Sequence, residues 1–341
     1  MATITFDDFS IQGEGIRKIR EQIAGKRLVH AILISGEPGT GKRTLAHLIS
    51  SALMCKADNG IPCGRCAGCR MALSGEHPDI TVIQKGIPIS PDIPKGRTTI
   101  PVDDIREMIR CCSQYALENG NRSVEIHDAE NMTAQAQNCL LKILEEPPAG
   151  AYFILTSSHP EQLLPTVRSR CRTVKLVPWE TSYIQEVLVK SGVSAEKAAT
   201  AASVSYGSIG NALRMASDDS YWQMREEVMN AFFRNRKRSD VLNLSSGWKD
   251  RKNDAEKLFS ILEEHLRRLF IFRIGPEGTC DISEFPPEWQ KFAAGASADR
   301  FAFLADRIRD ARKQNTYNVN FQAIIEQLIL TFTGESDIWV K

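Results

Sequence analysis

The sequence lacks a long hydrophobic run, a dominant charge and a secretory type of N-terminus. No apolar run approaches the roughly 20 residues that a membrane-spanning helix needs. The opening residues, MATITFDDFS, contain neither the basic nor the apolar block of a signal peptide. We therefore expect a cytoplasmic protein. The 43 Lys and Arg residues balance 42 Asp and Glu residues, so any contact with nucleic acid would depend on local patches.

The 341 residues are enough for two or three domains with cores of their own. Apolar segments typical of strands occur at 31–35, 123–130, 151–158 and 173–179, and helical patterns separate them. This alternation predicts a parallel α/β sheet over residues 1–178. Residues 56–101, rich in Cys, Gly and Pro, are expected to be irregular. Helical patterns then predict a small helical domain at 179–217 and an all-α C-terminal domain at 218–341.

A glycine-rich loop follows the first predicted strand. Gly36-Glu-Pro-Gly39-Thr-Gly41-Lys42 fits the G-x-x-x-x-G-K pattern between a strand and a helix. In this pattern backbone N–H groups and a helix N-terminus bind phosphate oxygens, and the lysine reaches the terminal phosphates. A chance match is the alternative interpretation. The residues expected to bind a nucleotide are Gly36, Gly39, Thr40, Gly41, Lys42, Thr44 and Asp128.

Two positions depart from what ATP hydrolysis requires. Arg43 stands where a Ser or Thr hydroxyl would ligate Mg²⁺, and Thr44 is one residue too late to replace it. The second predicted strand ends in His-Asp128-Ala129-Glu130, so Ala129 stands where a glutamate would activate water. Glu130 is offset by one residue and is expected to point elsewhere. The two departures together predict ATP or ADP binding that is weak or without hydrolysis. The alternative interpretation of residues 127–130 is a plain strand end and turn.

Four of the nine cysteines lie close together in the sequence, at positions 55, 63, 66 and 69. Four thiolates satisfy a tetrahedral Zn²⁺ ion and leave no position open for water. We therefore predict a structural zinc site made by Cys55, Cys63, Cys66 and Cys69. An iron–sulfur cluster, which also takes four thiolates, remains an alternative.

Four stretches together resemble the bacterial clamp-loader subunits of DNA polymerase III, which are AAA+ proteins. They are HAILISGEPGTGK, the four-cysteine module, NMTAQAQNCLLKILEEPP and ILTSSHPEQLLPTVRSRC. The resemblance covers roughly residues 5–215. It implies an AAA+ P-loop domain with a zinc module, a helical lid and a helical C-terminal collar that oligomerises.

Within this family the resemblance is to the delta-prime type rather than to the ATP-hydrolysing gamma/tau type. The gamma/tau type has Thr after the loop lysine, Asp-Glu at the second site and an arginine in Gly-Ser-x-Arg of the lid. Here the lid stretch is Gly207-Ser208-Ile209-Gly210, so glycine replaces that arginine. The chain itself is therefore not expected to be an active ATPase. An active gamma/tau-type ATPase and an AAA+ adaptor of another nucleic-acid machine are the alternatives.

The stretch Ser169-Arg170-Cys171 is intact, and the resemblance gives its arginine a role in a neighbouring subunit. There Arg170 would act as an arginine finger, a permanently charged donor that stabilises charge on the γ-phosphoryl group. An ordinary ion pair within the chain is the alternative interpretation. The partners implied are the gamma/tau and delta subunits, the sliding clamp and, through the assembly, primed DNA during DNA replication.

Overall fold

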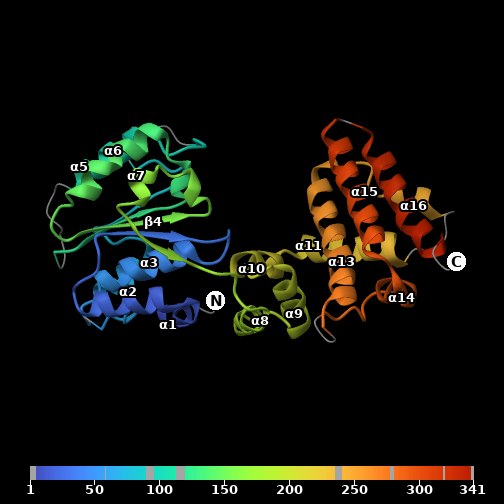
Figure 1. The fold of residues 1–341 in the computed structure, drawn as a ribbon, viewed down its shortest axis with the longest axis horizontal. Coiled ribbons are helices and arrows are strands. Elements are labelled where there is room, and N and C mark those ends of the chain that lie inside the picture. The colour runs from blue at the N-terminus through green and yellow to red at the C-terminus, as the bar shows by residue number, and fades with distance from the viewer. Residues whose placement is uncertain are drawn as a thin grey trace. The chain divides into compact units, whose positions relative to one another are not determined.

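The computed structural model describes residues 5–57, 59–89, 96–112, 120–234, 240–276, 280–317 and 319–338. Contacts divide the chain into two compact units, residues 1–216 and 217–341 (Figure 1). None of the described helices combines the length and the apolar character needed to cross a lipid bilayer. Most of the basic run at 234–240, for which the sequence favours a solvated surface over a contact with duplex DNA, lies outside the described residues.

A five-stranded parallel sheet forms the centre of the first unit, with the strand order β2-β3-β4-β1-β5. Its strands are β1 (Ala31–Ser35), β2 (Ile80–Ile83), β3 (Arg122–Ile126), β4 (Ala151–Ser157) and β5 (Arg172–Lys175). In β1, Leu33 lies opposite Leu155 of β4 and Thr173 of β5. Every residue of β1 is buried, as in a strand whose two faces are both covered.

Helices cover both faces of this sheet: α2 and α3 lie on one face, and α5 and α6 on the other (Figure 1). The helices of the first unit are α1 (Phe6–Phe9), α2 (Glu14–Ala24), α3 (Lys42–Leu53), α4 (Ala67–Ser74), α5 (Val102–Cys112), α6 (Ala134–Glu145), α7 (Pro165–Arg168), α8 (Thr181–Lys190), α9 (Ala195–Val204) and α10 (Ile209–Ser217). The Thr133 hydroxyl caps α6 by accepting the Ala136 N–H, and Pro147 and Pro148 follow its end.

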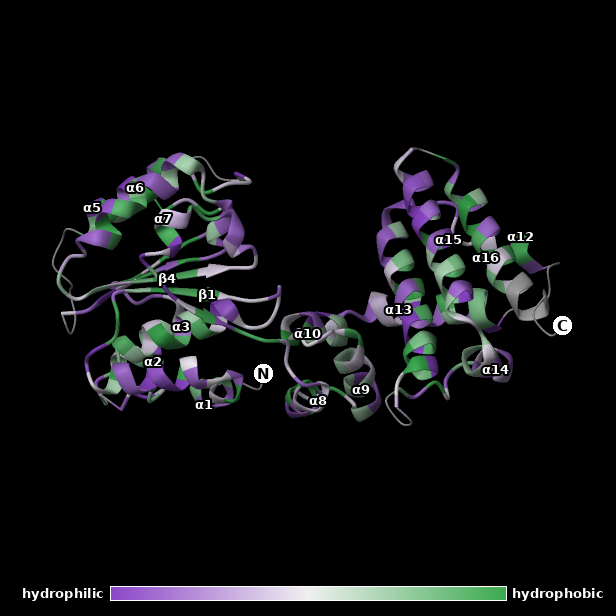
Figure 2. Cartoon of the chain, viewed as in Figure 1, coloured by the Kyte–Doolittle hydropathy of each residue, from purple (hydrophilic) through white to green (hydrophobic). Residues whose placement is uncertain are grey.

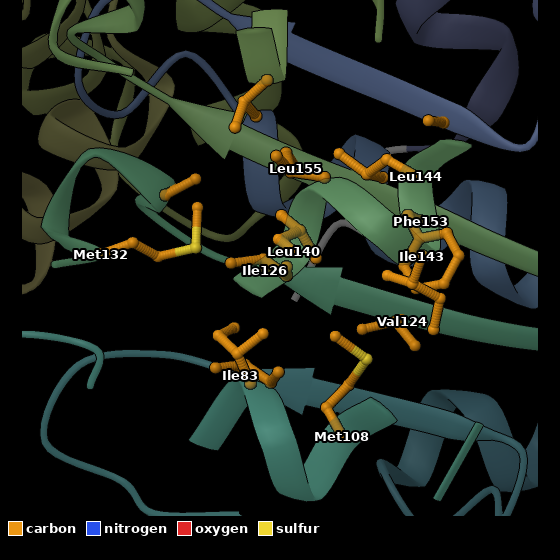
Figure 3. Packing of buried hydrophobic residues seen from close by; sticks show 14 of the residues in the cluster. Ile83, Met108, Val124, Ile126, Met132, Leu140, Ile143, Leu144, Phe153 and Leu155 are labelled. Atoms are coloured by element: carbon orange, nitrogen blue, oxygen red, sulfur yellow. The ribbon is translucent and has the colours of Figure 1, made fainter. Parts of the chain in front are cut away.

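The core between the sheet and its α5/α6 layer is built from aliphatic and aromatic side chains. Val124 of β3 and Phe153 of β4 point toward Met108 of α5 and Leu140 of α6 (Figure 3). All four side chains are fully buried. The strands β1 and β4 are coloured largely as hydrophobic (Figure 2). A sheet hydrophobic on both faces fixes the three-layer arrangement.

The predicted fold class, an α/β P-loop domain followed by helical regions, is confirmed. The prediction that residues 56–101 are irregular is wrong, because they contain α4 and the edge strand β2. The sequence of β2, ITVI, is short and partly exposed, so its pattern differs from that of the buried strands. The third cysteine of the module, Cys66, is the N-cap of α4, and its Sγ accepts the Cys69 N–H.

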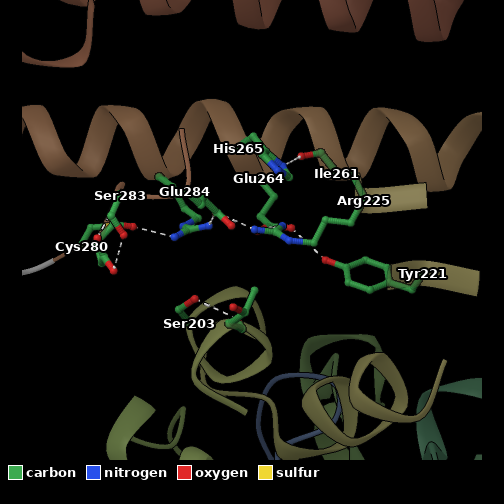
Figure 4. Close-up of polar contacts among 12 residues, drawn as sticks. Ser203, Tyr221, Arg225, Ile261, Glu264, His265, Cys280, Ser283 and Glu284 are labelled. Carbon is green, nitrogen blue, oxygen red and sulfur yellow. Dashed lines mark hydrogen bonds and ion pairs between the residues drawn. The ribbon is translucent and has the colours of Figure 1, made fainter. Parts of the chain in front are cut away.

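Helices joined by turns and short irregular segments make up the second unit, and its described residues contain no strand. Its α-helices are α11 (Asp219–Val228), α12 (Val241–Ser246), α13 (Ala255–Ile274), α14 (Pro287–Gly295), α15 (Ala298–Thr316) and α16 (Phe321–Ile338), and residues Met229–Arg234 form a π-helix. A buried polar network joins α11 to α13 (Figure 4). Arg225 donates to Glu264 at 2.6 Å and to Glu284 at 2.9 Å, and the Tyr221 hydroxyl donates to Glu264 at 2.8 Å. Each buried charge therefore has a partner, as a water-free interior requires.

His265 lies beside this network and is completely buried. Its ring stacks on Phe233 and meets Phe285 edge-on, and Nδ1 donates to the Ile261 carbonyl at 2.7 Å. Burial holds the pKa of His265 well below its usual value, and the nearby Arg225 and Arg268 charges add to the effect. The folded protein therefore keeps this imidazole neutral.

We expect the second unit to lose stability as the pH falls below about 6.5, the pKa of an exposed histidine. Below that pH the unfolded chain binds a proton at His265 that the folded chain does not, so acid favours unfolding. The loss is about 1.4 kcal/mol per pH unit from this one group. Chemical unfolding of the wild type and of His265→Phe at pH 7.5 and 5.5 measures it. An equal pH dependence in both proteins would contradict the assignment.

Candidate functional site

The glycine loop joins the carboxyl end of β1 to the N-terminus of α3. Gly39 and Gly41 have φ angles of +76° and +94°, a region that side chains with a Cβ rarely adopt. A Cβ at Gly39 would also lie 2.1 Å from Ser208 Oγ of the lid. In an open parallel sheet ligands bind outside the carboxyl ends of the strands, and the loop lies there together with the ends of β3 and β4.

The loop lysine lies within the loop itself. Lys42 is 6% exposed, and its Nζ donates to the carbonyl oxygens of Gly36 at 2.8 Å and Glu37 at 2.9 Å. Burial lowers the pKa of Lys42, while the carboxylates of Asp128, Glu130 and Glu37 act in the opposite direction. The ammonium group is thus hydrogen-bonded to carbonyl oxygens of its own loop.

Arg43 forms an ion pair with Asp128. Its Nη2 lies 2.5 Å from Asp128 Oδ2, and the two side chains are 51% and 25% exposed. Asp128 has a left-handed backbone (φ 49°), and its N–H donates to Thr156 Oγ1 of β4 at 3.1 Å. A Mg²⁺ ion at this loop would need a hydroxyl at position 43 and a free carboxylate. The residues present do not fit it, because a guanidinium replaces the hydroxyl and occupies the carboxylate.

The position of the missing glutamate is filled by Ala129, which is fully buried. The expectation that Glu130 points elsewhere is wrong, since Glu130 lines the same cavity as Lys42. The reason is the short 3-10 helix Ala129–Asn131, which turns the chain tightly after β3. One oxygen of the Glu130 carboxylate, Oε1, accepts the Ser158 N–H at 3.0 Å, and the other, Oε2, is buried with no hydrogen-bond partner among the described residues.

The lid contacts the glycine loop directly. The Gly210 N–H donates to the Gly39 carbonyl at 3.0 Å, and Trp179 Nε1 donates to the Thr40 carbonyl at 2.9 Å. A Cβ at Gly210 would come within 3.3 Å of Gly39 Cα, so the glycine allows this close approach. Gly210, at the position where the resemblance expects a lid arginine, thus lets α10 lie directly against the loop.

A cavity of about 790 Å³ opens over the loop. Five residues predicted to bind nucleotide line it: Gly39, Gly41, Lys42, Thr44 and Asp128. Gly36 and Thr40 do not; Thr40 is buried, with its hydroxyl bonded to the Glu37 carbonyl. Sequence reasoning missed two basic residues of the lining, Lys85 and Arg214. Arg214 follows Gly210 by four residues and so shares its helical face, a spacing visible in the sequence.

The four cysteines of the module come together. Their sulfur atoms all lie within 4.8 Å of one another, and the Cys63 and Cys69 sulfurs are 3.9 Å apart. A tetrahedral zinc ion with Zn–S bonds of about 2.3 Å places its sulfurs about 3.8 Å apart. The donor set and its spacing therefore fit zinc. Gly68 makes the fold possible, since a Cβ there would lie 2.4 Å from the Met54 carbonyl oxygen.

Backbone N–H groups point at the sulfurs of the module. Cys55 Sγ accepts from Ala57 and Cys63, Cys63 Sγ accepts from Cys66, and Cys66 Sγ accepts from Cys69, each at 3.4 Å. Hydrogen bonds from the Arg65 and Cys66 backbone lower the pKa of Cys63 to about 6. Burial raises the pKa of Cys69 to about 12, so its thiolate would need a cation beside it. Such donors favour the thiolate form that metals bind.

Arg170 follows α7 and is tied to its own chain. Its Nη2 forms an ion pair with Glu145 at the end of α6, and Nη1 donates to the Thr166 carbonyl at 2.8 Å. Nε is buried and has no partner among the described residues. About a third of the side chain remains exposed. The ion pair within the chain, one of the two interpretations from the sequence, is thus present in the single subunit.

Two family models match the chain. The model for the DNA polymerase III delta subunit matches residues 11–180, and the model for the C-terminal part of the DNA polymerase III delta subunit matches residues 219–334. Together they cover most of the sequence, including both units of the structure.

The chain is similar to several curated proteins. The DNA polymerase III subunit delta' of Escherichia coli is 38% identical over 204 residues, which are 59% of this chain and 58% of that protein. The delta' subunit of Bacillus subtilis is 26% identical over 94% of this chain and 95% of its own length. The tau subunit of E. coli is 31% identical over 54% of this chain and 27% of its own length. The match thus spans little more than half of the first of these relatives.

Among solved structures, a DNA polymerase III gamma subunit-related protein of Thermotoga maritima matches with a TM-score of 0.41 and 18% identity. That match covers 95% of this chain and 99% of the other.

Proposed function

Since the chain belongs to the DNA polymerase III delta-subunit family and is similar to its delta' members, we propose that it is a clamp-loader subunit that assists catalysis without hydrolysing ATP. In this proposal it assembles with gamma/tau and delta subunits, and the assembly loads the sliding clamp on primed DNA. Residues 1–178 form the AAA+ P-loop domain, residues 179–217 the lid, and residues 218–341 the collar that oligomerises.

The observation that supports the lack of hydrolysis best is the ion pair between Arg43 and Asp128. Hydrolysis at a loop of this type depends on a divalent ion that the hydroxyl and the aspartate hold. Here the first ligand is absent and the second is bound to a guanidinium at 2.5 Å. Ala129 removes the water-activating carboxylate as well. The loop is left with the capacity to bind phosphates, through its N–H groups and Lys42.

Arg170 is the residue we assign to catalysis in a neighbouring subunit. An ion pair as exposed as that between Arg170 and Glu145 contributes only about 0–1 kcal/mol. A guanidinium on the γ-phosphoryl group in the transition state contributes about 4–7 kcal/mol. The difference favours transfer of Arg170 to a neighbouring triphosphate when one is in reach.

The cysteine module is proposed to hold one structural zinc ion. The sulfurs, their spacing and the N–H donors fit a closed Cys₄ site. Bound there, zinc would supply structural stability rather than chemistry, because four protein ligands leave no position for a substrate.

The competing function is an active gamma/tau-type ATPase, and purified protein separates the two. We expect the isolated chain to show no ATPase activity above a Lys42→Ala control, because the metal site is blocked. Mixed with the gamma/tau and delta subunits of the same organism, it should form one complex, whose composition native mass measurement gives. Hydrolysis by the isolated chain that Lys42→Ala abolishes would support the competing function. Failure to join the complex would contradict the proposed one.

A further inference from the structure

We propose that the cavity over the glycine loop binds the di- or triphosphate of a nucleotide without any divalent cation, with Arg43 in the place of the metal and Arg214 as the contact from the lid. This inference rests on the proposed function of the loop as a nucleotide site and specifies its ligand. Three features of the cavity lead to it: its charge, the position of Arg43 and the position of Arg214.

The lining of the cavity carries more positive than negative charge. Four cationic side chains line it: Lys42, Arg43, Lys85 and Arg214. Two carboxylates, Asp128 and Glu130, oppose them, and Asp128 is already neutralised by Arg43. A nucleotide brought by Mg²⁺ has most of its phosphate charge compensated by the ion, whereas a metal-free nucleotide needs that charge from the protein. The four cationic side chains of this cavity supply that positive charge.

Arg43 stands at the first turn of α3, where the motif's hydroxyl would hold the metal. The bond from its Nη2 to Asp128 leaves Nη1 and Nε for other acceptors, and half of the side chain is exposed in the cavity. A guanidinium is permanently charged and donates in a planar fork that matches phosphate oxygens. Because Asp128 accepts the Nη2 hydrogen bond, the Arg43 guanidinium is positioned as a positive charge beside the loop. A metal ion would have to displace it.

Arg214 reaches the same cavity from the lid. It lies one helical turn beyond Gly210, and long side chains on a helix point back toward its N-terminus. Its Nε lies 3.4 Å from the Gly210 carbonyl, and Nη2 donates to Asn211 Oδ1. These contacts hold the guanidinium near the N-terminal turn of α10, which itself contacts the loop through Gly210 and Gly39. Arg214 can therefore contact phosphate where the family's arginine, four residues earlier, is absent.

Calorimetric titration of the full chain with ADP and ATP, each in magnesium chloride and in EDTA, tests the proposal. We expect dissociation constants that differ by less than about threefold between the two conditions. Pyrophosphate in EDTA is expected to displace ADP, because the phosphates are the recognised group. Binding that is tighter in magnesium by about threefold or more, or pyrophosphate that fails to displace ADP, would overturn the inference.

Substitutions at Arg43 and Arg214 test the role of each arginine in nucleotide binding. Arg43→Thr restores the hydroxyl and frees Asp128, so its nucleotide affinity is expected to become dependent on magnesium, whereas Arg43→Lys should remain independent of it. Arg214→Ala is expected to weaken ADP binding about 10-fold or more, as the loss of a charged hydrogen bond does. Arg17→Ala, at an exposed arginine of α2 outside the cavity, is the matched control and should bind as the wild type does.

The outcomes separate this inference from the function on which it rests. Affinity of Arg43→Thr that is equal in magnesium and EDTA, or unchanged affinity of Arg214→Ala, would remove the role of that arginine. Absence of ADP and ATP binding in both conditions would instead refute the nucleotide site itself. Binding that requires magnesium would leave the nucleotide site in place and refute only the metal-free mode.

Discussion

Replacing Arg170 with alanine is expected to reduce ATP hydrolysis sharply at the neighbouring subunit's site to which we assign this side chain. Loss of an arginine finger lowers the rate by about 10³- to 10⁵-fold at the affected site, or about 4–7 kcal/mol of transition-state stabilisation. The fold should tolerate the change, because the exposed pair with Glu145 contributes little stability. The measurement is single-turnover hydrolysis by the reconstituted complex, with its composition verified by native mass.

The neighbouring Arg168 provides a matched control. It lies two residues earlier at the end of α7 and is exposed, so Arg168→Ala removes the same charge from the same surface. Turnover should fall in Arg170→Ala and not in Arg168→Ala. Glu145→Gln frees Arg170 from its carboxylate and should leave turnover unchanged or raise it. Equal turnover in Arg170→Ala and wild type, in complexes of equal composition, would remove the role in a neighbouring subunit.

The sequence was sufficient to locate the glycine loop, because its signal is local. A buried strand, three glycines and a lysine must follow one another for the backbone to turn as it does, and all of them lie within residues 31–42. The same holds for α13, whose apolar spacing predicts residues 255–274, as the structure has them. Where one contiguous segment determines the structure, pattern reasoning works.

Contacts between distant segments were beyond the sequence pattern. The pair between Arg43 and Asp128 joins residues 85 positions apart, and only the sheet order brings their strands' ends together. The sequence pattern showed that Arg43 cannot ligate a metal ion. It did not show that Arg43 also forms an ion pair with Asp128, the other expected metal ligand. The prediction for Glu130 was wrong for a related reason. The 3-10 helix after β3 places this residue in the lining of the cavity, and the sequence pattern did not indicate that helix.

In the cysteine module the four ligand positions were predictable and the surrounding structure was not. The spacing of the cysteines identified the cluster, whereas α4 depends on contacts with α3, and β2 depends on its pairing with β3. Gly68 of α4 packs closely against the Met54 carbonyl oxygen, which a Cβ at Gly68 would approach to 2.4 Å. Nε2 of His47, on α3, is hydrogen-bonded to the Ala72 carbonyl of α4 at 2.8 Å. His47 Nδ1 also contacts the buried Glu125 of β3 at 3.2 Å. These contacts connect the module to the loop helix and the sheet.

Removal of zinc is the second change from which we expect a large effect. Apparent binding free energies of structural zinc sites are about 10–16 kcal/mol, comparable with the whole stability of a typical domain. Cys63→Ser removes one ligand at a partly exposed position, so its effect reports the metal more than core packing. We expect the variant to lose its zinc and the segment from Cys55 to Gly75 to lose protection against proteolysis.

The effect should extend beyond the module, because His47 and Met54 connect it to α3. Hydrogen exchange in the C-terminal half of α3 should accelerate in Cys63→Ser, and a chelator should have the same effect on the wild type. Cys139→Ser is the control, since Cys139 is also partly buried but lies on α6 outside the cluster. It should keep about one zinc per chain. Visible absorption with bound iron would indicate a cluster instead, and full protection of the metal-free variant would show that α3 and α4 hold the module without an ion.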